Sequence, residues 1–531
     1  MLILVLRLAV AVVQEIFRWE WLYYAGIIAG VLFLISLCDE LNDRFKRIPF
    51  GPMRLPIIGN RVQLALYGGN RPYVAITRMG RWYRSGFMKV FNGLSGYVSV
   101  NGAQRLSEVL HNDDEWAGER DEVWRLDRTE TEKRSTSSLA VWVSRRNTAT
   151  RCLESILLSR KEALNGLISK QVNDLLVGIE SQERVDKLGM REIGADTFLP
   201  YVISSVWSVL TGDVGIEVTD RRVQTIHRCL KDWEEKGVKL SAWSDHYPFM
   251  VRWFPGWAGW NKLQEVNHDF RKVLKSLIKE QYKKAEKGKL NNELSYVQAC
   301  IREFKELRKQ SFGSEQMNDS SSIALLFEFL CPGPLMTSSA VGFCLSYAAR
   351  DSAAQEKIAA EIRTVTRGVE GDVPKWEEME NMPFTAAFIL ESYRISSVVP
   401  LERRKLLKLV RSGEGIRFPR EMPLLLNYHS ANMDPKVWDE PAVFKPERFL
   451  DASGKRVVGQ DRLISLEAEK HLCAGEPLLR MILFSFLTGT LAKWRLDVSP
   501  NWKDKGSTYG LLNKPTPFRV VLKPRQHNKS Q

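Results

Sequence analysis

A single cysteine at the junction of a loop and a helix constrains the fold of this chain more than any other feature. Cys473 lies in the stretch 470–480, KHLCAGEPLLR, where Glu476 and Pro477 suit the first turn of a helix. A cysteine there sits among unpaired backbone N–H groups, which stabilise the thiolate that ligates iron. Gly475 lets the backbone pass close to a flat cofactor. The alternative is a buried structural cysteine near a helix start.

Length and composition fit one large, mostly helical catalytic domain with an anchor. The chain has 531 residues, of which 44% are hydrophobic and 26% charged, as in ordinary folded enzymes. The net charge of +14 is spread over the whole chain, without a long basic block. This distribution indicates a basic surface that binds an anionic membrane or an acidic protein partner. It does not indicate a nucleic-acid binding site. Seven cysteines without a CxxC indicate a reducing compartment.

The N-terminus is hydrophobic in two pieces, 2–13 and 22–38, and the second has no charged residue. Its length is at the lower limit for crossing a bilayer. Aromatic residues crowd one end and basic residues follow the other: Trp19, Trp21, Tyr23 and Tyr24, then Arg44, Lys46 and Arg47. This pattern predicts a single-pass anchor with the remaining chain on the cytoplasmic side. A cleaved signal peptide is the alternative, but no small-residue cleavage site follows.

A proline-rich segment at 48–60, IPFGPMRLPIIGN, cannot be helical and predicts a hinge that sets the domain at an angle to the anchor. An ordinary linker has the same composition. Short strands are expected around 97–100, and mainly helices from about residue 103. Between 160 and 320 the pattern predicts amphipathic helices separated by irregular stretches such as 241–260.

A helix predicted at 136–157 carries Trp142 and Arg146 on one face. An indole N–H beside a guanidinium can bind a carboxylate of a buried cofactor, although a solvated arginine packed over a tryptophan is the alternative.

The apolar run 321–349 contains CPGPLMTSS, where two prolines predict a kink that opens backbone carbonyls toward a pocket. A helix that ends and restarts is the alternative.

The helix predicted at 384–395 places Glu391 and Arg394 three residues apart beside an apolar face. Such charges are costly to bury unless paired, so we expect a structural ion pair in the core. Arg448 in the PERF sequence at 446–449 could join it.

With these motifs in this order, the chain resembles a cytochrome P450 of the microsomal, membrane-anchored type that is common among fungal and other eukaryotic enzymes. The resemblance extends from the anchor to about residue 490 and rests on the ordered series of motifs. It implies a mainly α fold with small β-sheets. The expected parts are an anchor with its flank at 1–47, a hinge at 48–60 and a haem-thiolate catalytic domain at 61–531.

The resemblance also implies roles for particular residues. Cys473 is expected to be the axial ligand of the haem iron. The expected ligands of the haem propionates are Trp142, Arg146, His471 and Arg403, with Arg404 as the alternative to Arg403. The expected structural triad behind the cysteine loop is Glu391, Arg394 and Arg448. Electrons are expected from NADPH through a membrane-bound reductase at the endoplasmic reticulum.

The sequence departs from the family pattern in two places. Before the cysteine, the positions usually held by a phenylalanine and two glycines carry Leu466, Glu467 and Glu469. In the central helix, the usual acid and threonine align with Leu335 and Met336. Thr337 follows directly and is the candidate catalytic hydroxyl, displaced by roughly 100° around the helix.

The expected function is a monooxygenase that oxidises a hydrophobic small molecule, in secondary metabolite biosynthesis as in many fungal members. Terpenoid, polyketide, alkaloid and fatty acid substrates all fit the sequence. The departures leave two alternatives. One is a haem-thiolate isomerase, dehydratase or cyclase that does not activate dioxygen, and the other is a degenerate binding protein without catalysis.

Overall fold

The computed structural model describes most of the chain. The described residues are 2–84, 86–111, 116, 118–120, 139–182, 190–213, 216–244, 247–286, 295–310, 329–369, 372–464, 475–498, 506–510 and 512–525. Cys473, His471 and the substituted positions Leu466, Glu467 and Glu469 therefore lie outside the described residues.

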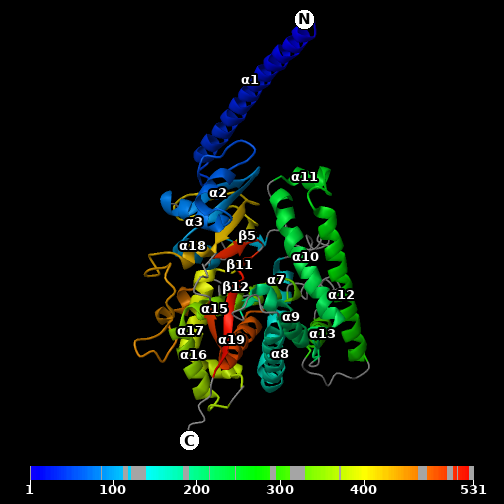
Figure 1. Cartoon of the computed structure of the whole chain (residues 1–531), viewed down its shortest axis with the longest axis vertical. Helices are drawn as coiled ribbons and strands as arrows, with labels where there is room; N and C mark the ends of the chain where they lie inside the picture. The colour runs from blue at the N-terminus through cyan, green and yellow to red at the C-terminus, as the bar shows by residue number, and fades with distance from the viewer. Residues whose placement is uncertain are drawn as a thin grey trace.

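Helices dominate the fold, which confirms the mainly α class predicted from the sequence (Figure 1). The first group is α1 (Leu2–Phe45), α2 (Arg61–Gly68), α3 (Pro72–Trp82), α4 (Ala103–His111), α7 (Leu139–Ser159), α8 (Lys161–Ser181) and α9 (Ala195–Thr211). The middle group is α10 (Arg221–Ser244), α11 (Pro248–Trp253), α12 (Trp260–Glu286) and α13 (Tyr296–Gln310). The last group is α15 (Pro332–Arg350), α16 (Ser352–Val365), α17 (Pro383–Ser396), α18 (Tyr428–Asn432) and α19 (Glu476–Lys493), with 3₁₀ turns η2 (Trp376–Asn381), η3 (Pro446–Phe449) and η4 (Gln460–Arg462).

The strands form small sheets beside the helices. The largest has the order β1-β2-β8-β5-β3, from β1 (Phe87–Asn92), β2 (Ser95–Val100), β8 (Pro423–Asn427), β5 (Leu401–Leu406) and β3 (Gly118–Arg120). A second sheet has the order β4-β12-β9, from β4 (Arg191–Ile193), β12 (Phe518–Pro524) and β9 (Trp494–Val498). Two hairpins pair β6 (Val410–Arg411) with β7 (Arg417–Phe418), and β10 (Ser507–Tyr509) with β11 (Asn513–Pro515).

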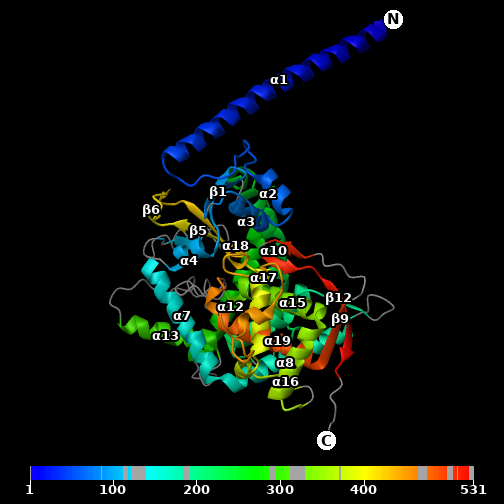
Figure 2. The same cartoon turned by 90° about the vertical axis from the view of Figure 1, so that its left-hand side faces the viewer.

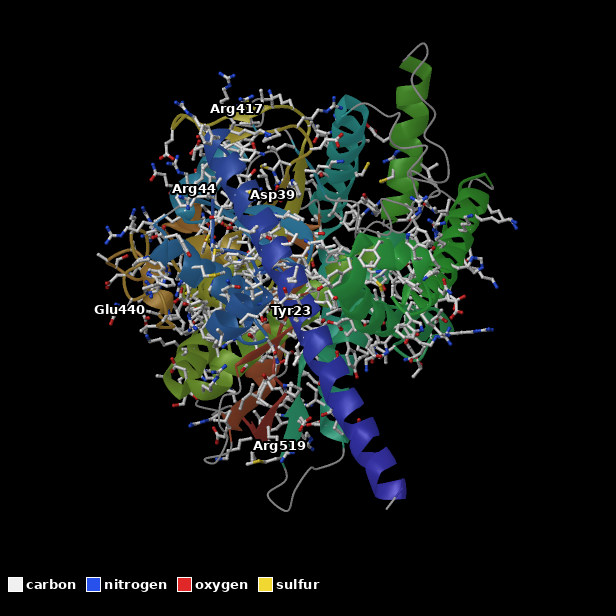
Figure 3. All side chains as sticks on the ribbon, turned by 90° about the horizontal axis from the view of Figure 1, so that it is seen from above. Tyr23, Asp39, Arg44, Arg417, Glu440 and Arg519 are labelled. Carbon is white, nitrogen blue, oxygen red and sulfur yellow. The ribbon has the colours of Figure 1, made fainter. Side chains whose placement is uncertain are left out.

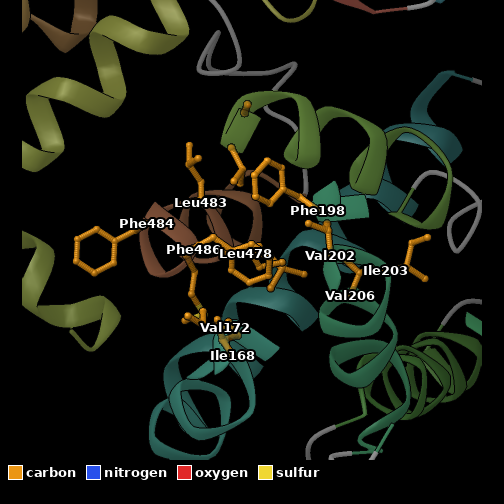
Figure 4. Packing of buried hydrophobic residues seen from close by; sticks show 14 of the residues in the cluster. Ile168, Val172, Phe198, Val202, Ile203, Val206, Leu478, Leu483, Phe484 and Phe486 are labelled. Carbon is orange, nitrogen blue, oxygen red and sulfur yellow. The ribbon is translucent and has the colours of Figure 1, made fainter. Parts of the chain in front are cut away.

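The main hydrophobic core lies where α8, α9, α15 and α19 pack together. Figure 4 shows side chains from α8, α9 and α19 meeting there, including Val172, Phe198 and Leu478. A Cβ on Gly489 would lie 2.3 Å from Val172 Cγ1, so the glycine allows α19 to approach α8 closely. Helices α15 and α19 are apolar on nearly all sides, which is why most of their residues are buried.

The central helix does not have the kink that the prolines predicted. Phe329 and Leu330 are helical, Cys331 forms a turn, and α15 begins at Pro332. A proline in the first turn costs no hydrogen bond, because the N–H groups there have no partner within the helix. The two prolines therefore restart the helix, which was the alternative interpretation.

The stretch 241–260 is more ordered than the sequence analysis expected. Helix α10 continues to Ser244 and α11 begins with Pro248 at its first position. The expectation of an irregular stretch was wrong for 248–253, because a proline at the first position favours a helix start, and it holds for 254–259, which are not helical.

The N-terminal helix α1 joins both hydrophobic pieces into one helix of 44 residues. Its part Leu22–Phe45 has a mean hydropathy of 1.9 and is only 6% buried, so within the described residues it is the one helix long and apolar enough to cross a membrane. Figures 1 and 2 show α1 projecting away from the rest of the domain, and in Figure 3, seen from above, α1 crosses over the domain.

Where α1 ends, the non-helical segment 48–60 follows and polar contacts attach this region to the domain. Asp39 pairs with Arg54 at 2.6 Å, and Asp43 pairs with Lys89 of β1. The Arg417 N–H donates to the carbonyl of Arg47 at 2.8 Å. These contacts fix the end of α1 and the segment 48–60 against the domain.

Candidate functional site

Three charged side chains from distant segments meet in the core. Helix α17 carries Glu391 and Arg394, whose side chains are fully buried. Arg394 Nε and Nη2 each lie 2.7 Å from a Glu391 oxygen. Arg448 of η3 reaches the same carboxylate, with its Nε 3.0 Å from Oε1, and the Lys445 N–H donates to it at 2.9 Å. The structure therefore brings together the three residues that the sequence analysis grouped.

The remaining donors of these arginines bind backbone carbonyls of the segment that leads to η3. Arg394 Nη1 donates to the carbonyls of Asn432 and Pro441, both at 2.8 Å. Arg448 Nη1 donates to the carbonyl of Asp439 at 2.9 Å. Buried charges are tolerable here because nearly every donor has an acceptor. The sequence carries no signal for these backbone partners.

The first turns of α15 hold three consecutive hydroxyls that all bind their own helix. The Thr337 hydroxyl donates to the Gly333 carbonyl at 2.8 Å. The Ser338 and Ser339 hydroxyls donate to the Leu335 carbonyl, at 3.2 Å and 2.7 Å. All three residues are buried.

The face of α15 that carries Gly333 borders open space among the described residues. A Cβ on Gly333 would meet no atom of the described residues within 4 Å, and Met336 is only partly buried. Because Gly333 and Met336 are three residues apart, they share one face of the helix. The sequence analysis noted Met336 only as a departure from a pattern and did not find this open face.

Helix α19 begins beside the start of α15. Gly475 caps α19, and a Cβ on it would lie 3.3 Å from the Phe329 ring. Glu476 pairs with Arg480 one turn later, at 2.7 Å. Cys473 and His471 precede Gly475 by two and four residues, so the chain leaves the described part next to α15.

The two candidate arginines of β5 project from opposite faces of the strand, because side chains alternate along a strand. The Arg403 guanidinium lies over the Tyr97 ring, 4.8 Å from its centroid. Arg404 is 4% exposed, and its Nε lies 3.4 Å from a Glu402 oxygen. Trp142 and Arg146 lie four residues apart on α7, and their side chains are outside the described part.

Comparison with known proteins identifies the family. The cytochrome P450 family model matches residues 49–522. The chain belongs to the cytochrome P450 family. Cytochrome P450 enzymes of this family hold a thiolate-ligated haem and receive electrons from NAD(P)H through reductase partners.

The curated relatives are similar to this P450 over nearly their whole length. Cytochrome P450 1A1 of Rattus norvegicus is 25% identical over 480 residues, which cover 88% of each chain. Cytochrome P450 1A1 of Homo sapiens is 25% identical over 504 residues, covering 93% of this chain and 96% of the relative. Cytochrome P450 1A1 of Chelon saliens is 24% identical over 497 residues, covering 91% and 92%. Sequence identity at this level supports the family and the microsomal type, but it does not define a specific activity. The fungal origin expected from the sequence stays a prediction.

Three buried cysteines of this P450, in the part of the chain that the structure describes, are poor candidates for a metal-binding thiolate. Burial raises the pKa of Cys229 to about 11 and that of Cys344 to about 12. Burial also raises the pKa of Cys331 well above its usual value. Cys38 is exposed on α1, within the anchor. A neutral thiol is a poor iron ligand, so burial argues against Cys229, Cys331 and Cys344 as the axial ligand.

Proposed function

We propose that this P450 oxidises a hydrophobic small molecule in secondary metabolite biosynthesis, with Cys473 as the axial ligand of its haem iron. Membership of the family supports the broader statement, haem-thiolate monooxygenase chemistry on a hydrophobic substrate. The observation that carries the residue assignment is the close approach of Gly475 to the Phe329 ring. It places the start of α19, which follows Cys473 in the sequence, beside the residues that precede α15.

The described surroundings fit a flat cofactor. Open space lies beside Gly333 on α15, and α19 begins at Gly475 on the other side of this region. In our proposal Trp142, Arg146, His471 and Arg403 hold the haem propionates. The thiolate-ligated haem, when bound, supplies the oxygen activation and redox chemistry.

We prefer Arg403 over Arg404 because of the charges that surround each guanidinium. The Arg404 guanidinium already contacts the Glu402 carboxylate, which also accepts a hydrogen bond from the Tyr428 hydroxyl. Arg403 projects to the other face of β5, where it stacks on Tyr97. A propionate bound by Arg404 would lie near the carboxylate of Glu402 and be repelled by it.

Proton supply is the step in which this P450 differs from the family pattern. Leu335 and Met336 have no proton to donate, and the Thr337 hydroxyl donates to the Gly333 carbonyl. Thr337 remains the one candidate catalytic side chain on α15, yet its hydrogen bond directs its proton along the helix. We therefore propose that water or the substrate supplies the protons.

We also propose a single-pass protein of the endoplasmic reticulum, with its anchor and flank at 1–47, a hinge at 48–60 and a catalytic domain at 61–531 facing the cytoplasm. The microsomal relatives and α1 support a membrane anchor. Aromatic side chains of α11 and the following turn add to this support, because Trp253 is 72% exposed and Trp257 is 87% exposed. Figure 1 places α11 at the same end of the domain as α1, where exposed aromatic side chains suit a bilayer interface.

The deciding experiment is the carbon monoxide difference spectrum of the purified, reduced full chain. A thiolate-type spectrum is expected for the wild type and for Cys344→Ala, the control at a buried cysteine. Cys473→Ala and Cys473→Ser are expected to lose this spectrum and keep the fold, as judged by circular dichroism. An unchanged spectrum in both variants would remove Cys473 from the site, and no haem spectrum in the wild type would indicate a binding protein without catalysis.

A second measurement separates the monooxygenase from a haem-thiolate isomerase, dehydratase or cyclase. Oxygen uptake is followed with NADPH, a microsomal reductase and a panel of hydrophobic substrates. Substrate-dependent uptake with an oxygenated product supports the proposal. Conversion of a substrate without oxygen uptake would instead establish the isomerase type of chemistry, which the comparisons do not support.

A further inference from the structure

The short hairpin of β6 and β7 lies against the end of the anchor helix. The Arg417 N–H donates to the carbonyl of Arg47, which follows the last residue of α1, Phe45, by two positions. A Cβ on Gly415, in the turn of the hairpin, would lie 3.7 Å from Arg47 Nη1. Figure 2 shows β6 near the end of α1, and Figure 3 shows Arg417 and Arg44 on the face from which α1 leaves the domain. The hairpin and the end of the anchor therefore form one surface.

Like charges face each other across this hairpin. Arg411 and Arg417 are directly opposite in the antiparallel register of β6 and β7, and both are exposed. Like charges in such positions destabilise a strand pair. Among the residues that the structure describes, no carboxylate lies within ion-pair distance of either guanidinium. The hairpin thus holds two cations together at a cost in stability, which an anionic ligand would remove.

The carboxylates nearest to these arginines in the sequence pair with other residues. Glu414, in the turn of the hairpin, pairs with Arg105 of α4. Glu421, which follows β7, pairs with Lys405 at 3.6 Å. The carboxylates at the end of α1 also have partners: Asp39 with Arg54, Glu40 with Arg44, and Asp43 with Lys89. Acidic side chains of this region therefore leave the positive charge of the hairpin uncompensated.

Exposed residues of the hairpin and of the anchor end form a basic surface, which we call the anchor-side patch: Lys46, Arg47, Arg411 and Arg417. Large apolar side chains accompany these cations, because Phe45 is 93% exposed and Leu409 is 47% exposed. Cations mixed with exposed apolar side chains are typical of surfaces that lie in the interface of an anionic bilayer. Ion pairing with an acidic protein would leave the exposed apolar groups unexplained.

We propose that the anchor-side patch binds the anionic phospholipid headgroups of the membrane that α1 crosses. The inference rests on the proposed single-pass anchor, because α1 brings the patch to the cytoplasmic leaflet. Headgroup phosphates accept hydrogen bonds from Arg411 and Arg417 and offset their mutual repulsion, while Phe45 and Leu409 enter the interface. A second attachment point beside the anchor limits rotation of the catalytic domain about α1.

The test uses the full chain in lipid nanodiscs with a fluorescent probe on the hairpin. Gly413 is exposed, and a Cβ on it would meet no atom of the described residues within 4 Å, so Gly413→Cys can carry the environment-sensitive dye NBD. Cys38→Ser removes an exposed native thiol from this background. The nanodiscs contain phosphatidylcholine alone or phosphatidylcholine mixed with phosphatidylserine. We expect phosphatidylserine to raise NBD emission about twofold, and NaCl at about 1 M to reverse the rise, because the Debye length falls to about 3 Å.

Variants separate lipid binding from a structural role. Arg411→Gln combined with Arg417→Gln should lose the rise in emission with phosphatidylserine. Its midpoint of thermal unfolding in detergent should be unchanged or higher, because the opposed like charges are gone. Arg411→Lys combined with Arg417→Lys keeps both charges and should keep the rise. The matched control is Arg363→Gln with Arg367→Gln, which removes two exposed charges near the end of α16, far from α1 in Figure 1.

Incorporation into phosphatidylcholine nanodiscs tests the anchor on its own, so failure of the anchor and failure of the patch are distinguishable. A chain that does not enter these nanodiscs would contradict the anchor and this proposal with it. A chain that enters them and shows equal emission in both lipids would overturn the proposal alone, and so would loss of the rise in the Arg363 and Arg367 control. A rise that requires an added microsomal reductase, with or without phosphatidylserine, would assign the patch to an acidic protein instead.

Discussion

Glu391 and Arg394 form a bidentate ion pair in which both side chains are fully buried and both N···O distances are 2.7 Å. Their spacing on α17 brings them onto one face of the helix, and Arg448 adds a second cation to the same carboxylate. The pair then binds backbone carbonyls that belong to the segment before the cysteine loop. This ion pair on α17 therefore holds the irregular segment 432–441 of the catalytic domain in place.

Removing one partner of this pair should prevent stable folding. Glu391→Gln leaves Arg394 and Arg448 buried without a counter-charge, which typically costs about 3–5 kcal/mol. We expect little soluble, haem-loaded protein, measured as haem per milligram after purification. Glu265→Gln is the control, because Glu265 forms an exposed pair with Lys262. Normal haem loading of Glu391→Gln would show that the buried pair does not support the fold.

The two arginines of β5 should respond differently to the same substitution. Arg403→Gln should fold normally but lose haem during gel filtration, because a propionate loses its charge-assisted hydrogen bonds. Arg404→Gln should keep its haem in the molecules that fold, since Arg404 contacts Glu402 on the other face of the strand. The haem-to-protein ratio is the measurement. The assignment is reversed if Arg404→Gln loses haem and Arg403→Gln retains it.

Thr337→Ala should have little effect on coupling. The hydroxyl donates to the Gly333 carbonyl within α15, so its loss should change the ratio of product to NADPH by less than about twofold. General acid catalysis by this hydroxyl would instead make its loss cost roughly 10²–10⁴ in rate. Ser339→Ala serves as the control, because Ser339 makes the same type of bond one half-turn later. A large diversion of NADPH to hydrogen peroxide in Thr337→Ala alone would establish Thr337 as the proton donor.

Stability should fall as the pH decreases below neutrality, with His429 as one cause. Burial lowers the pKa of His429 from 6.5 to about 3, and Arg81, Arg71 and Arg78 lower it further. Between these values the unfolded chain binds a proton that the folded chain does not, so stability is lost as the pH falls through 6.5. The linkage relation gives a loss of about 2 kcal/mol between pH 7 and pH 5.

The measurement for His429 is the midpoint of urea unfolding across this pH range. His429→Asn should have a shallower pH dependence than the wild type, whatever its absolute stability. His111→Asn should keep the wild-type slope, because His111 is exposed on α4. Identical slopes in the wild type and His429→Asn would exclude His429 as a source of acid sensitivity.

Features that depend on local spacing could be predicted from the sequence. An uncharged run beside aromatic and basic flanks predicted the anchor, and α1 extends through it. The three-residue spacing of Glu391 and Arg394 predicted an ion pair, because residues so placed share a helix face. The ordered series of motifs predicted the cytochrome P450 family, which the match over 49–522 confirms. These features need only neighbouring residues or their order along the chain.

Features that depend on contacts between distant segments were decided by the tertiary structure. Whether Pro332 kinks or restarts a helix depends on the turn at Cys331, and Arg403 and Arg404 differ only because each meets a different face of the sheet. The backbone carbonyls that bind Arg394 have no signal in the sequence, because they come from Asn432 and Pro441, 38 and 47 residues further along the chain. Local propensity acts within a few residues, whereas burial and pairing are set by whichever distant segments the fold places side by side.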